Sequence, residues 1–227
     1  MKIYGLQKTS LLDYPEHLSA ILFTGGCNFN CPYCQNSELL HPLNCTPLDH
    51  EDIFSFLKKR AGILEGVVIT GGEPSLASDL DEFIRRVRDL GLKIKLDTNG
   101  THPEQIRSLL KQHLLDYIAM DVKACPEHYC RAAGISSVSM EAIRQSIDLV
   151  MSSGLPYEFR TTVVKELHDL SHFHQLGELL SGAALCWLQT FRDGETVNVQ
   201  GLHPFSEEEM AKAAEILQLY VQEVKIR

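Results

Sequence analysis

Three cysteines near the amino end of the chain have the spacing of metal ligands. Cys27, Cys31 and Cys34 lie in the segment GGCNFNCPYCQN, which follows the apolar run 18–23. Thiolates at this spacing can bind zinc or an iron–sulfur cluster. Structural zinc usually takes four protein ligands, and a cluster of four irons normally takes four thiolates. A set of three therefore leaves one metal position open, and an open position is where a metal site does chemistry.

The other cysteines bear on the choice between zinc and iron–sulfur. They show no second Cys-x2-Cys pair that would complete a structural zinc site; they are Cys45, Cys125, Cys130 and Cys186. We therefore interpret the first three as ligands of an iron–sulfur cluster. The remaining four are interpreted as core or surface thiols, and a redox or second-cluster role for Cys125 and Cys130 stays open.

Composition limits the class of protein. The chain has 227 residues, of which 44% are hydrophobic, which is enough for one substantial core. Its 21 basic and 30 acidic residues give a net charge of −9, which argues against a nucleic-acid partner. The sequence shows neither a signal-peptide pattern nor an apolar run that could span a membrane. We expect a cytoplasmic protein with reduced thiols.

Strand-like apolar runs alternate with segments of helical periodicity. The strand-like runs are 18–23, 67–70, 94–97, 117–121, 159–164 and 184–189. The helical stripes span 80–90, 106–114, 140–150, 170–180 and 210–221, with Ser206 as N-cap of the last. This alternation predicts an α/β fold with parallel strands and outer helices. Six strands are too few for a closed barrel, so we expect a partial (β/α)6 TIM-like barrel that forms one domain over 1–227.

Polar residues follow nearly every predicted strand. In barrels of this kind the carboxyl ends of the strands form the active-site rim. After the cysteine loop, the residues at these ends are Gly71, Gly72, Glu73, Asp97, Thr98, Asp121, Lys123 and Arg160. Any one of them could belong to a turn or a helix cap, but their shared position on one rim favours a binding site.

Each group has a structural and a functional interpretation. The two glycines and Glu73 could form a plain strand-to-helix turn, or their backbone could approach a ligand closely and receive its ammonium group. Asp97 and Thr98 could cap a turn, or could bind a ribose, a carboxylate or a cation. Arg160 on a buried strand needs an anionic partner. Tyr33 could stack on a purine or shield the metal.

The order of the motifs identifies a resemblance. Cys27-x3-Cys31-x-Tyr33-Cys34 followed by Gly71-Gly72-Glu73-Pro74 resembles the radical S-adenosylmethionine superfamily. The segments TSLLDYPE and CQN further resemble activating enzymes of glycyl-radical proteins, especially the anaerobic ribonucleoside-triphosphate reductase activating group. Many relatives have His where this chain has Gln35, and Gly where it has Glu16.

This resemblance implies the cofactors and their ligands. The loop 24–36 would hold a [4Fe-4S] cluster on Cys27, Cys31 and Cys34, and S-adenosylmethionine would bind the open iron. Gly71, Gly72 and Glu73 would hold its amino group. The surrounding contacts would come from Tyr33, Asp97, Asp121, Lys123 and Arg160, and Asp97, Thr98 and Asp121 could also hold a monovalent cation.

The resemblance also implies the reaction and its partners. Flavodoxin or ferredoxin would reduce the cluster, and S-adenosylmethionine would be cleaved to methionine and a 5′-deoxyadenosyl radical. That radical would take a hydrogen atom from a glycine of a partner enzyme, anaerobic ribonucleotide reductase being favoured. The chemistry resides in the cofactor, so no catalytic acid or base is expected.

Three alternatives remain at this point. The first is an activase of the pyruvate formate-lyase type. The second is a radical enzyme that acts on a small molecule, such as a 7-carboxy-7-deazaguanine synthase. The third is a non-catalytic iron–sulfur or zinc-binding protein.

Overall fold

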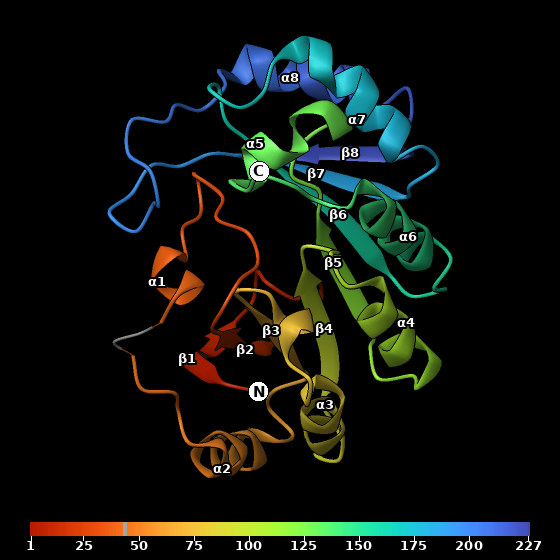
Figure 1. Ribbon diagram of the computed structural model, residues 1–227. Helices are drawn as coiled ribbons and strands as arrows, with labels where there is room; N and C mark the ends of the chain where they lie inside the picture. Colours follow the sequence, from red (N-terminus) through yellow and green to blue (C-terminus); the bar gives the residue numbers. More distant parts are fainter. Residues whose placement is uncertain (43–44) are drawn as a thin grey trace.

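A curved sheet of eight strands organises the protein. The computed structural model describes residues 1–42 and 45–227. The strands lie side by side in chain order (Figure 1). They are β1 (Ile3–Ser10), β2 (Ser19–Thr24), β3 (Gly66–Gly71), β4 (Lys93–Thr98), β5 (Tyr117–Asp121), β6 (Tyr157–Val163), β7 (Leu185–Thr190) and β8 (Glu223–Ile226). Only β1 is antiparallel to its neighbour, and every later pair is parallel.

Helices connect the parallel strands and cover the outside of the curve (Figure 1). The longer ones are α2 (His50–Arg60), α3 (Leu80–Arg88), α4 (Pro103–Lys111), α6 (Met140–Met151), α7 (Phe173–Leu179) and α8 (Glu207–Leu217). Short pieces are α1 (Ser37–Leu40), α5 (Tyr129–Ala133), η1 (Pro74–Leu76), η2 (Pro126–His128) and η3 (Leu170–His172). The predicted N-cap is confirmed, because the Ser206 side chain accepts from Glu209 N in a capping box.

The expected partial barrel is confirmed, but the strand count is wrong by two. Among the described residues, β1 and β8 each pair with one neighbour only, so the sheet stays open. These two edge strands escaped prediction because neither shows a continuous apolar run. Residues 7–9 of β1 are exposed, and β8 has four residues, none of them buried.

The two faces of the sheet differ in chemistry. The outer face packs against the helices and forms the main apolar core. On the inner face, Ile21, Val68, Lys95 and Tyr117 are register partners across four neighbouring strands, and Tyr14 packs against this row. This small cluster lies toward the amino ends of the strands. Two residues further along β3 and β4 the inner face carries the polar Thr70 and Asp97, and β5 ends in Asp121, so polar groups gather at the carboxyl ends of these strands.

None of the described helices has the length and apolar character needed to cross a membrane.

Candidate active site

All twelve residues that the sequence singled out line one cavity. The cavity has a volume of about 550 Å³ and lies at the carboxyl ends of the parallel strands. The members from the sequence are Cys27, Cys31, Tyr33, Cys34, Gly71, Gly72, Glu73, Asp97, Thr98, Asp121, Lys123 and Arg160. These twelve residues come from five separate segments that meet at one place, as expected for strand ends on one rim.

The cysteine loop has no regular structure and is held by backbone hydrogen bonds from several directions. Asn30 N donates to the carbonyl of Ala133 in α5 (2.9 Å), and Gly26 N donates to Leu39 in α1 (2.8 Å). From the far end of the chain, Asn198 N donates to Cys34 O (3.1 Å). These contacts fix the loop over the open end of the sheet, with its three thiols free of disulfides.

Burial keeps these thiols protonated in the absence of a metal. Desolvation raises the pKa of Cys27 to about 12 and also raises the pKa values of Cys31 and Cys34. The ammonium of Lys123 acts in the opposite direction on all three. Since a metal binds thiolate, binding would release the thiol protons, and Lys123 would offset the negative charge that forms.

The two glycines bring the end of β3 against the cysteine loop. Gly71 has φ +112°, and a Cβ there would lie 2.5 Å from the backbone N and O of Thr24. A Cβ on Gly72 would lie 2.0 Å from Gly26 O. The Glu73 N–H also donates to Gly26 O (2.8 Å). Two glycines are therefore needed because the backbone at the end of β3 contacts the backbone of residues 24–26, and a side chain at either glycine would prevent that contact.

Glu73 joins β3 to the end of β4. Its carboxylate is 2% exposed. One oxygen, Oε1, accepts from Thr98 Oγ1 (2.7 Å) and Ser75 N (3.0 Å), and Oε2 accepts from Asn99 N (2.6 Å). Burial raises the pKa of Glu73, and the hydrogen bonds from Ser75, Thr98 and Asn99 act against that rise.

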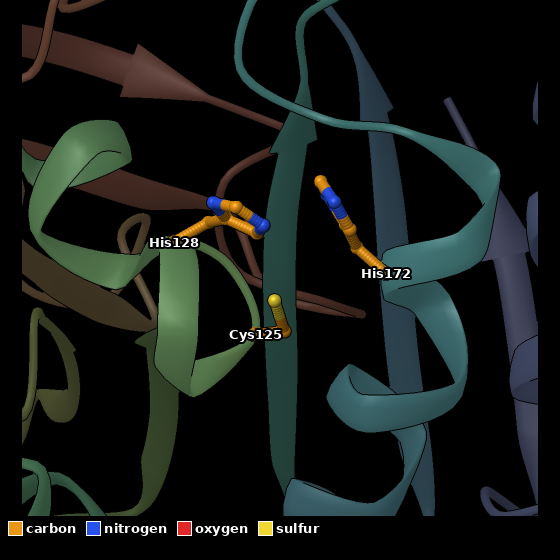
Figure 2. A group of neighbouring side chains, drawn as sticks. All are labelled: Cys125, His128 and His172. Carbon is orange, nitrogen blue, oxygen red and sulfur yellow. The ribbon is translucent and has the colours of Figure 1, made fainter.

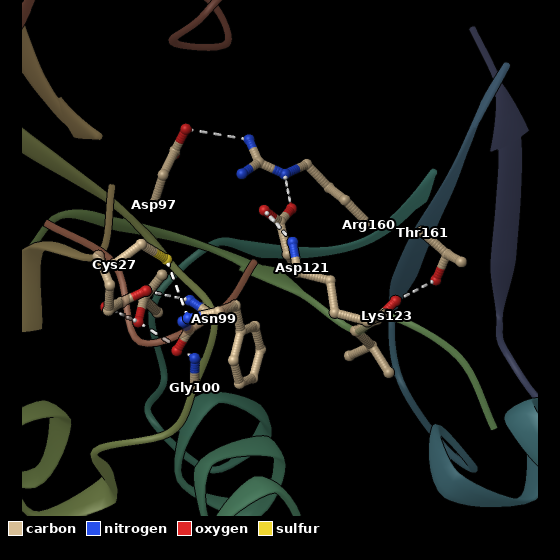
Figure 3. A network of polar contacts seen from close by, with 12 residues as sticks. Cys27, Asp97, Asn99, Gly100, Asp121, Lys123, Arg160 and Thr161 are labelled. Atoms are coloured by element: carbon tan, nitrogen blue, oxygen red, sulfur yellow. Dashed lines mark hydrogen bonds and ion pairs between the residues drawn. The ribbon is translucent and has the colours of Figure 1, made fainter. Parts of the chain in front are cut away.

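Arg160 links two carboxylates that come from different strands (Figure 3). Its Nε donates to Asp121 Oδ1 (2.7 Å), and its Nη1 donates to Asp97 Oδ2 (3.0 Å). Lys123 Nζ lies 3.2 Å from Asp121 Oδ2. Although burial acts in the opposite direction, these cations hold the pKa values of Asp97 and Asp121 below their ordinary range. Both carboxylates are therefore ionised at neutral pH.

Two charged residues of this network escaped prediction. Lys95 is 2% exposed and its Nζ lies 2.9 Å from Asp97 Oδ1. Glu158 is 3% exposed and lies 3.8 Å from Arg160 and 3.9 Å from Lys95. One feature of the sequence could have identified them. Residues two positions apart in a strand lie on the same face, which places Lys95 with Asp97, and Glu158 with Arg160. In the sequence Lys95 only interrupted an apolar run.

The cavity fits a cluster with a polar ligand. Its wall combines three thiols with a buried polar group that lacks a partner: the hydroxyl of Tyr33 makes no hydrogen bond to any described residue. An unpaired buried hydroxyl is costly, so a bound molecule that offers it a partner would be favoured. The donor set and the charged wall thus suit an iron–sulfur cluster and a zwitterionic ligand.

Comparison with known proteins identifies the class to which this cavity belongs. The model of the Radical SAM superfamily matches residues 21–179. The chain is a member of the radical SAM superfamily and is thus an enzyme of radical chemistry, a family that uses a [4Fe-4S] cluster and S-adenosylmethionine.

One relative matches almost from end to end. It is the Methanocaldococcus jannaschii protein named "Putative glycyl-radical enzyme activating enzyme MJ1227", which is 32% identical over 99% of this chain and 95% of its own length. The GTP 3′,8-cyclase of Nautilia profundicola is 30% identical, but over 64% of this chain and 47% of the cyclase.

Solved structures agree on the fold. Streptococcus suis SuiB bound to S-adenosylmethionine superposes with a TM-score of 0.66, over 91% of this chain and 51% of SuiB. The sequence identity is 13%, so this likeness concerns the fold alone.

Proposed function

We propose that this protein activates a partner enzyme by making a glycyl radical on it, with anaerobic ribonucleotide reductase as the favoured partner. The observation that carries the proposal is the match to a relative named as such an activating enzyme over nearly the full length of both chains. When bound, the cluster supplies the electron that cleaves S-adenosylmethionine to the radical that takes hydrogen from glycine.

In this proposal the cysteine loop and the end of β3 hold the reacting groups. Cys27, Cys31 and Cys34 ligate the cluster, and the backbone at Gly71 and Gly72 with the carboxylate of Glu73 receives the amino group of S-adenosylmethionine. Among the described residues, Oε2 of Glu73 accepts one hydrogen bond, so it can accept a second from an ammonium.

The charged network on the inner face would position the remainder of S-adenosylmethionine. Carboxylate oxygens of Asp97 and Asp121 can accept from ribose hydroxyls, because ionised oxygens accept more than one hydrogen bond. Lys123 and Arg160 would balance the carboxylate of the ligand and the thiolates. Tyr33, whose hydroxyl is free among the described residues, would pack against the cofactor and donate to it.

A monovalent cation on Asp97, Thr98 and Asp121 has weaker support. Both carboxylates already face Arg160, and the Thr98 hydroxyl donates to Glu73. A further cation would compete with these groups. The electron donor, flavodoxin or ferredoxin, is a part of the proposal that rests on the resemblance, and the cytoplasmic location is a part that rests on the expectation from the sequence.

A second candidate is a radical enzyme for a small molecule, such as a 7-carboxy-7-deazaguanine synthase. The partial match to a GTP 3′,8-cyclase favours it, but this chain spans about half of that cyclase. A nucleotide enzyme of that kind and an activase would therefore have a similar radical SAM domain, and only the identity of the substrate distinguishes the two candidates.

Electron paramagnetic resonance tests the proposal directly. The protein with its cluster, S-adenosylmethionine and a reductant is mixed anaerobically with each candidate partner from the source organism. We expect a glycyl-radical doublet with one partner, which disappears when the candidate glycine of that partner is replaced by alanine. If GTP or a pterin is converted to product and raises 5′-deoxyadenosine formation above the level without it, while no partner gives the doublet, the small-molecule candidate replaces this proposal.

A further inference from the structure

Three side chains outside the cavity converge in a way that no part of the radical chemistry explains. Sγ of Cys125 and one ring nitrogen each of His128 and His172 all lie within 4.8 Å of one another. In Figure 2 the two imidazole rings face each other above the sulfur of Cys125. Cys125 and His128 follow β5, in and beside η2, whereas His172 ends η3 after β6.

The pair of histidines lacks the partners that a purely structural role would provide. The ring centroids of His128 and His172 lie 3.9 Å apart. Nδ1 of His172 is buried and makes no hydrogen bond to any described residue. A buried ring nitrogen without a partner is costly, and so is a positive charge on one ring beside the other. A metal ion bound to one nitrogen of each ring removes both costs, because it uses the in-plane nitrogen lone pairs and keeps both rings neutral.

The local fold holds the third ligand in place. Oδ1 of Asp169 accepts from the backbone N and the hydroxyl of Ser171 (2.9 and 2.7 Å), which caps η3 one residue before His172. Cys125 is 1% exposed and directly precedes η2, so burial constrains its position. The side chains converge from two short helical segments.

The ligand types select a class of metal. One thiolate and two imidazoles suit zinc and similar transition metals, whereas calcium and magnesium require oxygen ligands. With zinc bonds of about 2.3 Å to sulfur and about 2.0–2.1 Å to nitrogen, tetrahedral ligand atoms lie roughly 3.3–3.6 Å apart. The ligand atoms, all within 4.8 Å of one another, can close on an ion when the side chains rotate so that the two rings, now 3.9 Å apart, turn their nitrogens toward it.

We propose that Cys125, His128 and His172 bind one zinc ion, with water as the fourth ligand. The ion joins the segment after β5 to the segment after β6. Cys125 is two residues beyond Lys123, whose carbonyl accepts from His168 Nε2 (3.0 Å). The zinc site therefore restrains the segment that carries Lys123 into the main cavity, while it shares no ligand with the cysteine loop.

The first experiment measures zinc in a full-length chain in which Cys27, Cys31 and Cys34 are all replaced by Ala, so that the cluster cannot form. We expect about one zinc per chain by elemental analysis, bound with release of the Cys125 thiol proton. Cobalt in place of zinc should give tetrahedral ligand-field bands and thiolate-to-cobalt charge-transfer absorption. Less than about 0.1 equivalent of either metal, in a chain that is folded by circular dichroism, overturns the proposal.

Matched variants locate the ion. Cys125→Ser and His172→Asn should each reduce bound zinc to background and abolish the thiolate-to-cobalt absorption. Cys130→Ser on α5 should retain both the zinc and the absorption. Equal zinc in the Cys125→Ser and Cys130→Ser variants contradicts the assignment. If the chain with the three alanines does not fold, Cys125→Ser and Cys130→Ser are instead compared in the protein that holds its cluster, and both zinc and iron are measured. In that experiment, a parent protein without zinc overturns the proposal, and so does a zinc content that Cys125→Ser leaves unchanged.

Discussion

The carboxylate of Glu73 accepts a hydrogen bond from the hydroxyl of Thr98, with 2.7 Å between Oε1 and Oγ1. Glu73 follows β3 and Thr98 ends β4, so the two residues lie 25 positions apart in the sequence but on neighbouring strands. Both are buried. With the bond from Asn99 N to Oε2, this contact ties the end of β3 to the end of β4. Glu73 therefore holds the rim of the cavity together as well as facing into it.

Replacement of Glu73 by Gln tests this role. A glutamine amide has one acceptor oxygen, so its NH2 group must face either the Asn99 N–H or the donors at Oε1. We expect a loss of about 1–3 kcal/mol in the free energy of unfolding, together with weaker binding of S-adenosylmethionine. Urea unfolding and equilibrium dialysis measure the two effects. Glu82→Gln on the exposed side of α3 is the control, and a similar small effect of both changes would speak against the role.

Replacement of Gly72 by Ala should damage the cysteine loop. The added Cβ would lie 2.0 Å from Gly26 O, which is backbone and cannot move aside without moving the loop. We expect reduced iron and sulfide content after anaerobic reconstitution. Gly194→Ala is the matched control, because a Cβ there meets nothing within 4 Å. A normal cluster content in the Gly72→Ala variant would show that contact between the two backbones is not needed.

Replacement of Arg160 by Met should leave Asp97 and Asp121 without their shared cation. Removal of one partner from a buried ion pair costs about 3–5 kcal/mol, and since Asp121 keeps some contact with solvent we expect about 2–4 kcal/mol. The unfolding free energy at pH 7 measures this loss. Arg85→Met, which removes an exposed pair with Asp81, should cost less than about 1 kcal/mol. Comparable losses in both variants would contradict the network.

The stability of the fold should depend on pH through His168. Burial lowers its pKa below the ordinary value of 6.5, although the hydrogen bonds of the ring with the backbone of Lys123 and Val164 act in the opposite direction. The unfolded chain binds the proton more tightly, so stability should be complete above pH 6.5 and should fall below it, by at most about 1.4 kcal/mol per pH unit.

Unfolding between pH 5.5 and 8, with a chelator present to remove loosely bound divalent metals, measures this dependence. His168→Gln should reduce the slope below pH 6.5, whereas His174→Gln, at an exposed position, should leave it unchanged. An identical slope in the parent and in the His168→Gln variant would assign the effect to other groups.

The residues at the rim of the site could be predicted from the sequence, because parallel strands end at the same edge of a sheet. That single rule placed Glu73, Asp97, Asp121 and Arg160 in one cavity without any knowledge of their contacts. It could not show that Glu73 and Thr98 bond to each other, since hydrogen-bond partners depend on rotamers and register.

The contacts of the remaining residues could not be predicted, because their partners come from distant parts of the sequence. Lys95 lies on β4 between apolar residues, and the Glu158 that lies 3.9 Å from it comes from β6, two strands away on the same face of the sheet. Cys125 and His172 are far apart in sequence, and neither has a motif around it, so only the adjacent ends of β5 and β6 bring them together.

The formation of 5′-deoxyadenosine tests the central assignment most directly. The reconstituted protein is incubated anaerobically with dithionite and S-adenosylmethionine, and the product is quantified by chromatography. The parent and the Cys45→Ala variant, changed at an exposed thiol outside the cavity, should both form 5′-deoxyadenosine. Cys31→Ala should form none and should bind less iron. Product from the Cys31→Ala variant at the rate of the parent, or a parent that holds zinc without iron and forms no product, would contradict the assignment.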